Sequence, residues 1–153
     1  SPVSAGLDGV ELRRNWKLRK APRYRDAVRK IQSHGIRVNA CFVLGLDGHT
    51  SAIFDSVLRF AEELGLYEVQ VTVLTAFPGT PLHERLAREG RILEPGRWDL
   101  CTLFDVNFRP THMTPDELAQ GMRWLTRRLY SARTTQRRRR PFFEHVRAKP
   151  TAA

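Results

Sequence analysis

Residues 35–82 read GIRVNACFVLGLDGHTSAIFDSVLRFAEELGLYEVQVTVLTAFPGTPL, and this stretch decides the fold. Residues 36–44 form a nearly unbroken apolar run that ends at Gly45, which is typical of a strand covered on both faces. Residues 50–65 place apolar side chains at helical spacing between a threonine that can cap the helix and a glycine that can end it. Residues 69–74 alternate valine with other side chains, as a second strand does. This order predicts a βαβ unit with two parallel strands.

Helices are predicted on both sides of this unit. Pro22 opens a helix that runs to His34, directly before the first strand. After the second strand, Thr80 and Pro81 begin a short helix that Gly90 ends. The sequence TPDE at residues 114–117 has the pattern of a capping box, and an apolar stripe at helical spacing follows it: Leu118, Met122, Leu125 and Leu129. The alternation of helices and strands predicts an α/β fold with one packed core.

The composition excludes several classes of protein. The chain has 153 residues and two cysteines, Cys41 and Cys101, which are too few for a disulfide framework or a metal site. No apolar run approaches the ~18 residues that cross a bilayer, so we expect a soluble, cytoplasmic protein. Because the first residue is serine, we also expect the chain to be part of a longer protein.

The positive charge is concentrated at the C-terminal end. The net charge is +10, and residues 121–153 hold ten of the 26 basic side chains but only one acidic side chain, Glu144. Arg137–Arg140 and the residues after them are therefore expected to form an exposed, flexible tail. An alternative function follows from this tail, namely a nucleic-acid-binding module that contacts phosphates through its arginines.

One face of the two predicted strands carries polar side chains. Asn39 and Cys41 lie on that face of the first strand, and Gln70 and Thr72 lie on that face of the second. The loops that follow the two strands, GLDGHT and TAFPGT, lie at the edge where α/β folds bind their ligands. Equally, Gln70 and Thr72 can be satisfied by their neighbours alone. No phosphate-binding loop, catalytic triad or carboxylate pair is present, so composition and pattern lead only to an α/β domain with a ligand face.

Four stretches in this order resemble one family, the radical S-adenosylmethionine enzymes. HGIRVNACFVLGLDGHTSAIF resembles the fifth barrel strand of these enzymes and the loop after it, and VQVTVLTAFPGTPLHERLAREGRIL resembles their sixth strand. The opening SPVSAGL resembles the segment after their fourth strand. FRPTHMTPDELAQGMRWLTRRLYSARTTQRRRRPFF resembles the helical extension of a subgroup associated with a cobalamin-binding domain.

The resemblance implies a fold and a set of cofactors. Residues 1–110 would form the C-terminal half of a partial (β/α) barrel of the TIM type, residues 111–135 a C-terminal helical extension, and residues 136–153 a basic tail. The family binds S-adenosylmethionine on a 4Fe-4S cluster, and the longer members of the subgroup also carry cobalamin. The cysteine loop that ligates the cluster is absent from this sequence, so we expect no metal ligand and no activity from the chain alone.

The resemblance also assigns roles to individual residues. Val43 and Gly45 on the first strand would contact the adenosine of the cofactor, as would the main chain of Leu74, Thr75 and Ala76 after the second strand. Ser4 and Lys17 would approach the ribose or the methionine end, and Asn39, Gln70 and Thr72 would face the substrate.

No catalytic residue is assigned, and neither the substrate nor the type of reaction follows from the sequence. The expected partners are the N-terminal half of the same enzyme and a small-molecule substrate, without nucleic acid or a membrane span. A third possibility is a structural remnant that has lost its activity.

Overall fold

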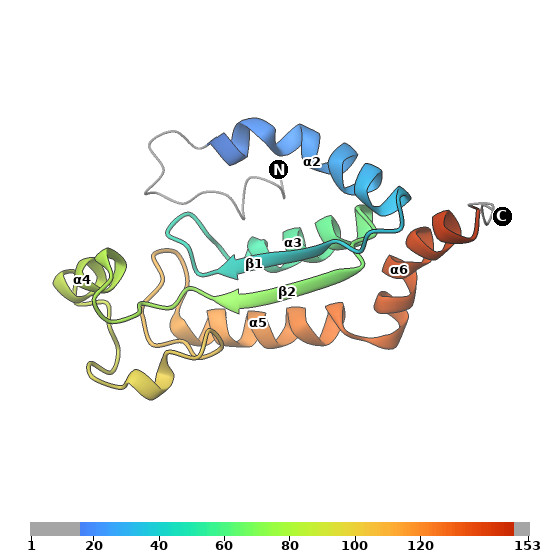
Figure 1. Cartoon of the computed structure of the whole chain (residues 1–153). Coiled ribbons are helices and arrows are strands. Elements are labelled where there is room, and N and C mark those ends of the chain that lie inside the picture. The colour runs from blue at the N-terminus through green and yellow to red at the C-terminus, as the bar shows by residue number, and fades with distance from the viewer. Residues whose placement is uncertain (1–15, 149–153) are drawn as a thin grey trace.

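A computed structural model describes the backbone of residues 16–148 and the side chains of residues 23–148. Helices and strands alternate through the first half of this part of the chain, and helices make up the second half (Figure 1). In chain order the elements are α2 (Trp16–Ser33), β1 (Asn39–Leu44), α3 (Ala52–Glu63), β2 (Glu68–Val73), α4 (Pro81–Arg88), the short 3₁₀ helix η1 (Trp98–Leu100), α5 (Pro115–Leu129) and α6 (Ala132–Arg147).

The two strands are parallel neighbours, as the βαβ pattern predicts. Asn39 pairs with Glu68 at one end of the ladder, and Leu44 pairs with Val73 at the other. Among the described residues the sheet contains these two strands and no other. The prediction of an α/β fold with parallel strands is therefore confirmed, while the partial barrel stays a prediction.

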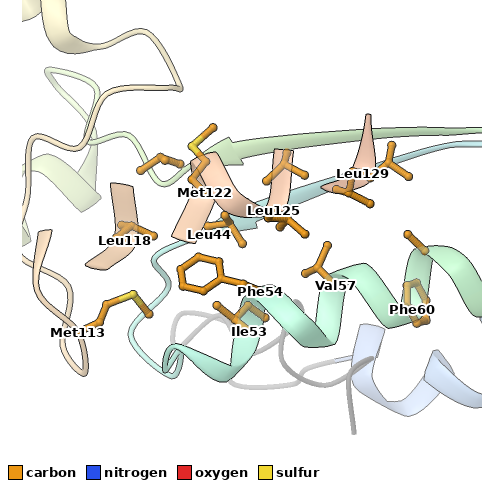
Figure 2. Close-up of a cluster of buried hydrophobic side chains, with 14 of the residues drawn as sticks. Leu44, Ile53, Phe54, Val57, Phe60, Met113, Leu118, Met122, Leu125 and Leu129 are labelled. Atoms are coloured by element: carbon orange, nitrogen blue, oxygen red, sulfur yellow. The ribbon is translucent and has the colours of Figure 1, made fainter. Parts of the chain in front are cut away.

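Helices α3 and α5 lie along the sheet and enclose the main core (Figures 1 and 2). The apolar stripe of α5 is buried as predicted, with Leu118, Leu125 and Leu129 at 0% exposure. Gly121 lies on the same helix where the ring of Phe54 from α3 packs directly against it, so any larger side chain would collide with that ring. Burying this many side chains stabilises the fold through the hydrophobic effect, at roughly 25 cal/mol per Å² of apolar surface. The buried cluster comprises Leu44, Ile53, Phe54, Val57, Phe60, Ala61, Leu64, Leu66, Val69, Val71, Val73, Leu86, Phe108, Met113, Leu118, Met122, Leu125 and Leu129.

Two of the predicted caps are present in the structure. The Thr80 hydroxyl accepts a hydrogen bond from His83 N at the start of α4. At the start of α5, the Thr114 hydroxyl accepts from Glu117 N, and the Glu117 carboxylate accepts from Thr114 N at 2.7 Å. These three bonds satisfy N–H groups that a helix end leaves without an intrahelical partner.

Some predicted boundaries are wrong. Helix α2 begins at Trp16 and not at Pro22, because the residues between them are good helix formers that extend the helix upstream. Residue Ser51, not Thr50, occupies the N-cap position of α3, and its side chain makes no capping bond. Strand β1 begins at Asn39 rather than at Ile36, which is 58% exposed.

The C-terminal arginines lie on a helix and not in the flexible tail that we expected, and one of them is buried. Helix α6 spans Ala132–Arg147, and its Arg138 is only 1% exposed. The Arg138 guanidinium donates to Leu66 O at 2.6 Å and to Leu129 O at 3.0 Å, which stabilises α6 against the start of β2. Burial lowers the pKa of Arg138. The expectation for residues 136–147 is therefore wrong because one arginine of the run finds buried carbonyl partners.

The neighbours of Arg138 are also engaged within the chain. Arg137 lies 3.6 Å from the Glu62 carboxylate, Arg139 pairs with Glu68 at 2.6 Å, and Arg140 pairs with Glu144 at 2.7 Å. The run therefore does not form one free cationic segment. Arg137 and Arg140 nevertheless keep 69% and 79% of their side chains exposed, so the nucleic-acid alternative stays a prediction.

Candidate functional site

The carboxyl ends of both strands meet at the same edge of the sheet, and two loops leave the sheet there. The loop after β1 turns at Gly45, whose φ of 89° favours glycine. A Cβ atom at Gly45 would lie 2.8 Å from Phe108 Cζ and 2.9 Å from Leu118 Cδ2, so the loop approaches the core closely. Gly45 thus has a packing role at this edge, and its contact with a cofactor stays a prediction.

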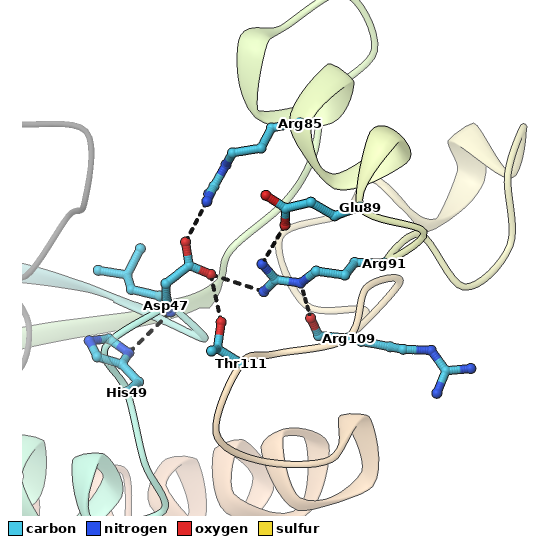
Figure 3. Close-up of polar contacts among 8 residues, drawn as sticks. Asp47, His49, Arg85, Glu89, Arg91, Arg109 and Thr111 are labelled. Atoms are coloured by element: carbon cyan, nitrogen blue, oxygen red, sulfur yellow. Dashed lines mark hydrogen bonds and ion pairs between the residues drawn. The ribbon is translucent and has the colours of Figure 1, made fainter.

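Asp47, in the loop after β1, connects that loop to three distant segments (Figure 3). Its carboxylate accepts from Arg85 at 2.6 Å, from Arg91 at 2.9 Å and from the Thr111 hydroxyl at 2.9 Å. Arg91 also donates to Arg109 O and pairs with Glu89, so the network extends along the segment after α4. Together these contacts fix the positions of the loops around the carboxyl end of β1.

The Asp47 carboxylate is charged at any ordinary pH. Partial burial raises its pKa, but hydrogen bonds from Arg85, Thr111 and Arg91 outweigh that effect and hold the pKa at about 2, below the ordinary 3.8. The two arginine side chains balance the negative charge of this carboxylate. Asp47 is therefore a residue that positions the loops rather than a general base.

A narrow pocket lies at the carboxyl end of β2. Leu74, Thr75 and Ala76 form its wall on the strand side, and residues 92–108 supply most of the opposite wall. The Leu74 N–H donates to Leu44 O at 2.8 Å, which continues the ladder to the pocket. Among the described residues, no hydrogen bond is made by the N–H groups of Thr75 and Ala76. The other lining residues are His83, Ile92, Glu94, Gly96, Trp98, Leu100, Cys101, Asp105, Asn107 and Phe108.

The predicted polar face of the sheet also exists. Asn39, Val43 and Gln70 are exposed, and Thr72 is half-buried beside Val43, its partner in the register. The neighbouring Cys41 thiol donates to Gln70 at 3.5 Å, and the Thr72 hydroxyl donates to Phe42 O at 3.5 Å. These long contacts are weak, so the side chains are partly satisfied by their neighbours and partly open.

The structure thus brings the predicted residues together in two groups. Leu74, Thr75 and Ala76 line the pocket at the end of β2, whereas Asn39, Val43, Gln70 and Thr72 lie on the open face of the sheet. Ser4 lies outside the described residues, as does the side chain of Lys17.

The sequence analysis missed the network around Asp47. Its partners lie 38, 44 and 64 residues away along the chain, so no local spacing reveals them. One signal was available, because an aspartate in a loop directly after an apolar strand lies at the edge where α/β folds bind ligands. Its arginine partners could not be chosen among the other basic residues without the fold.

Two possible features are absent from the described part of the chain. Within it, no group of three or more histidine, cysteine, aspartate or glutamate side chains could hold a metal ion. No helix found in residues 16–148 is long and apolar enough to cross a membrane.

Comparison with known proteins identifies the relatives of this chain. Residues 80–153 match a family described as a domain of unknown function, DUF4070. Domains of this family form the C-terminal part of cobalamin-associated radical S-adenosylmethionine methyltransferases. The predicted resemblance to this family is therefore confirmed for residues 80–153.

Individual relatives carry methyltransferase names. An uncharacterized methyltransferase of Synechocystis sp. is 35% identical over 91 residues, which is 60% of this chain and 17% of the relative. The hopanoid C-2 methylase of Rhodopseudomonas palustris is 38% identical over 68 residues, or 44% of this chain and 13% of that protein. The bacteriochlorophyllide d C-12(1)-methyltransferase of Chlorobaculum tepidum is 24% identical over 115 residues, covering 75% of this chain and 25% of that enzyme. The chain thus matches a quarter or less of the length of each of these relatives.

Proposed function

We infer that this chain is the C-terminal part of a radical S-adenosylmethionine methyltransferase and that its sheet edge supplies contacts for the adenosyl group and the substrate. The observation that carries this inference is the placement of Leu74, Thr75 and Ala76. These residues line the pocket that lies where a parallel sheet presents its carboxyl end, which is the usual ligand edge of α/β folds.

The main chain at the end of β2 suits an adenine ring. Thr75 and Ala76 offer N–H groups that make no hydrogen bond within the described residues, and an adenine edge presents nitrogen acceptors. Ile92, Trp98 and Phe108 provide apolar surface in the same pocket against which a flat ring can pack. The donors and apolar side chains thus match the chemistry of an adenine ring, but the pocket has a free volume of only about 20 Å³, so residues 92–108 would have to move outward to admit the ring.

The open face of the sheet continues from this pocket. Val43 would contact the adenosyl group from β1, and Asn39, Gln70 and Thr72 would orient the substrate through amide and hydroxyl groups. When bound, S-adenosylmethionine supplies the methyl group and the adenosyl radical chemistry of the family. The network around Asp47 keeps the surrounding loops in place while these groups bind.

Other parts of the enzyme must come from elsewhere. Because residues 23–148 contain no group of side chains able to hold a metal ion, a 4Fe-4S cluster needs ligands outside them. Cobalamin would likewise be bound by an N-terminal domain, so the chain alone is expected to be inactive. The N-terminal part of the same enzyme is the partner that this proposal requires.

Charged substitutions at the two ends of the β1 segment test the proposal. In the full-length protein, Val43→Asp places a carboxylate on the open face near the carboxyl end of β1, where the side chain of Val43 is 39% exposed. We expect it to weaken S-adenosylmethionine binding at least tenfold, and to reduce 5′-deoxyadenosine release, because the adenosyl group would have to desolvate that charge.

Ile36→Asp is the matched control, because Ile36 is 58% exposed and precedes the strand at its other end. It should leave cofactor binding unchanged. If both variants bind S-adenosylmethionine as the unmodified protein does, this edge is not the cofactor site. A remnant without activity would show no binding at all in the assembled protein.

A further inference from the structure

The outer surface of α5 carries arginines around an exposed tryptophan, and no step of the proposed chemistry uses it. A shallow hollow on this helix is lined by Gln120, Arg123, Trp124, Arg127 and Arg128. We call these five residues the α5 surface. They belong to the helix whose opposite side is the buried leucine stripe, so they are held on a rigid element.

The arginines of the α5 surface have no acidic partners. Arg123, Arg127 and Arg128 are all exposed, and none forms an ion pair with any side chain that the structure describes. Three of the six other arginines in residues 121–148 differ in this respect, since Arg137, Arg139 and Arg140 are paired with glutamates. The surrounding segment adds to the positive electrostatic potential, because residues 121–148 hold nine arginines and one glutamate. The α5 surface is therefore a cationic surface without internal compensation.

Trp124 lies among these charges and keeps 38% of its surface exposed. The Arg128 guanidinium lies 5.7 Å from the centre of its ring, within the range of a cation–π contact. An exposed indole flanked by arginines is typical of surfaces that lie at the headgroup level of a bilayer, where the ring enters the interface and the arginines contact phosphates.

The shape of this surface favours a membrane over a nucleic acid. Proteins that bind single strands use a charged groove with several stacking rings, whereas the α5 surface has one ring in a shallow hollow. Helices that read duplex DNA project into the major groove, whereas α5 is packed through its leucine stripe onto α3 and the sheet. A flat layer of anionic headgroups can contact the outer side of such a helix without any groove.

We propose that the α5 surface docks the protein on anionic phospholipid membranes, with Arg123, Arg127 and Arg128 contacting headgroup phosphates and Trp124 entering the interface. The attachment is peripheral and reversible, and its strength falls with salt because the charges are exposed. This proposal does not depend on the proposed function, since it concerns where the protein binds and not which reaction it performs.

Vesicle co-sedimentation of the full-length protein that contains this chain tests the proposal. Vesicles with about a third of phosphatidylglycerol should bind the protein, and vesicles of phosphatidylcholine alone should not. The triple variant R123E/R127E/R128E should bind the anionic vesicles on the order of a hundredfold more weakly, at roughly fivefold for each arginine. Trp124→Ser should weaken binding several-fold and provides a second variant if the triple variant does not fold.

The matched control is R59E/R88E/R109E, which changes the net charge by the same amount at three exposed arginines that form no ion pair within the described residues. It should keep most of the binding. An equal loss in both triple variants would show attraction by net charge alone and would overturn the proposal. Failure of the unmodified protein to bind anionic vesicles would also overturn the proposal. So would a variant R123E/R127E/R128E that still binds vesicles but no longer binds a DNA oligonucleotide.

Discussion

The two ends of the β1–β2 sheet are stabilised in different ways. At the amino end of β2, Arg138 is 1% exposed and donates to main-chain oxygens of Leu66 and Leu129, and Gln32 bonds Gly65 O and Tyr67 N. At the carboxyl end, Asp47 contacts the side chains of two arginines and a threonine, and a pocket lies beside them.

This difference indicates that the amino end of the sheet serves mainly stability, whereas the carboxyl end is the one that can bind a ligand. At the amino end, the side chains of Arg138 and Gln32 bond main-chain groups, which are present whatever the neighbouring side chains are. The carboxyl end is fixed by side chains on loops, which can differ without changing the fold. We therefore expect substitutions at the amino end to affect mainly stability, and substitutions at the carboxyl end to affect ligand binding as well.

Removal of the buried arginine should have the largest effect. Arg138→Met loses two short charge-assisted hydrogen bonds, to Leu66 O and Leu129 O, and a weaker bond of 3.4 Å to Tyr67 O. At about 2 kcal/mol for each short bond, we expect the free energy of unfolding to fall by about 4 kcal/mol, measured by urea denaturation. Arg137→Met is the control, because that side chain is 69% exposed and its ion pair measures 3.6 Å, and it should change stability by less than about 0.5 kcal/mol. Similar losses of unfolding free energy in the two variants would contradict the claim that the buried bonds of Arg138 stabilise the amino end of the sheet.

Substitution of Gly45, at the turn after β1, should give the next largest loss of stability. Gly45→Ala meets both an unfavourable φ of 89° and the close contacts with Phe108 and Leu118, and we expect it to cost about 3 kcal/mol. Gly79→Ala has a similar φ of 76° but open space around the new methyl group, so it should cost only about 1 kcal/mol. The difference between the losses of unfolding free energy in the two variants gives the cost of the close contacts at Gly45 alone. Equal costs would mean that the loop does not approach the core as closely as the structure shows.

The Asp47 network should give a smaller, pH-dependent effect. Because the folded pKa of about 2 lies below the ordinary 3.8, the network contributes stability above about pH 4 and loses it as the pH falls through about 2. This shift corresponds to about 2 kcal/mol. Unmodified protein should therefore lose about 2 kcal/mol more than Asp47→Asn between pH 5 and pH 2, measured by thermal unfolding at each pH. Parallel pH profiles for the two proteins would show that the arginines do not stabilise the carboxylate.

Much of the fold could be predicted because its signals are local. The valine alternation in β2, the Thr114 capping box and the leucine stripe of α5 each lie within a few neighbouring turns, and all three appear in the structure as expected. Parallel pairing followed from one crossover helix between two strands.

The features that were missed depend on distant contacts. Arg138 is separated from Leu66 by 72 residues, so the sequence shows only an arginine run that is normally solvated. Asp47 likewise finds its partners on segments that become neighbours only after folding. In both cases a charged side chain was buried or paired by the tertiary structure, which local propensity does not determine.

Photolabelling of the full-length enzyme with 8-azido-S-adenosylmethionine tests the central claim most directly, namely that the carboxyl edge of the sheet binds the adenosyl group. Trypsin cleavage after Arg37, Arg59 and Arg85 yields peptide 38–59, which contains Val43, and peptide 60–85, which contains Leu74, Thr75 and Ala76. We predict that the label appears on peptide 60–85 and that excess S-adenosylmethionine prevents it. Specific labelling confined to other peptides, with none on 38–59 or 60–85, would contradict the claim.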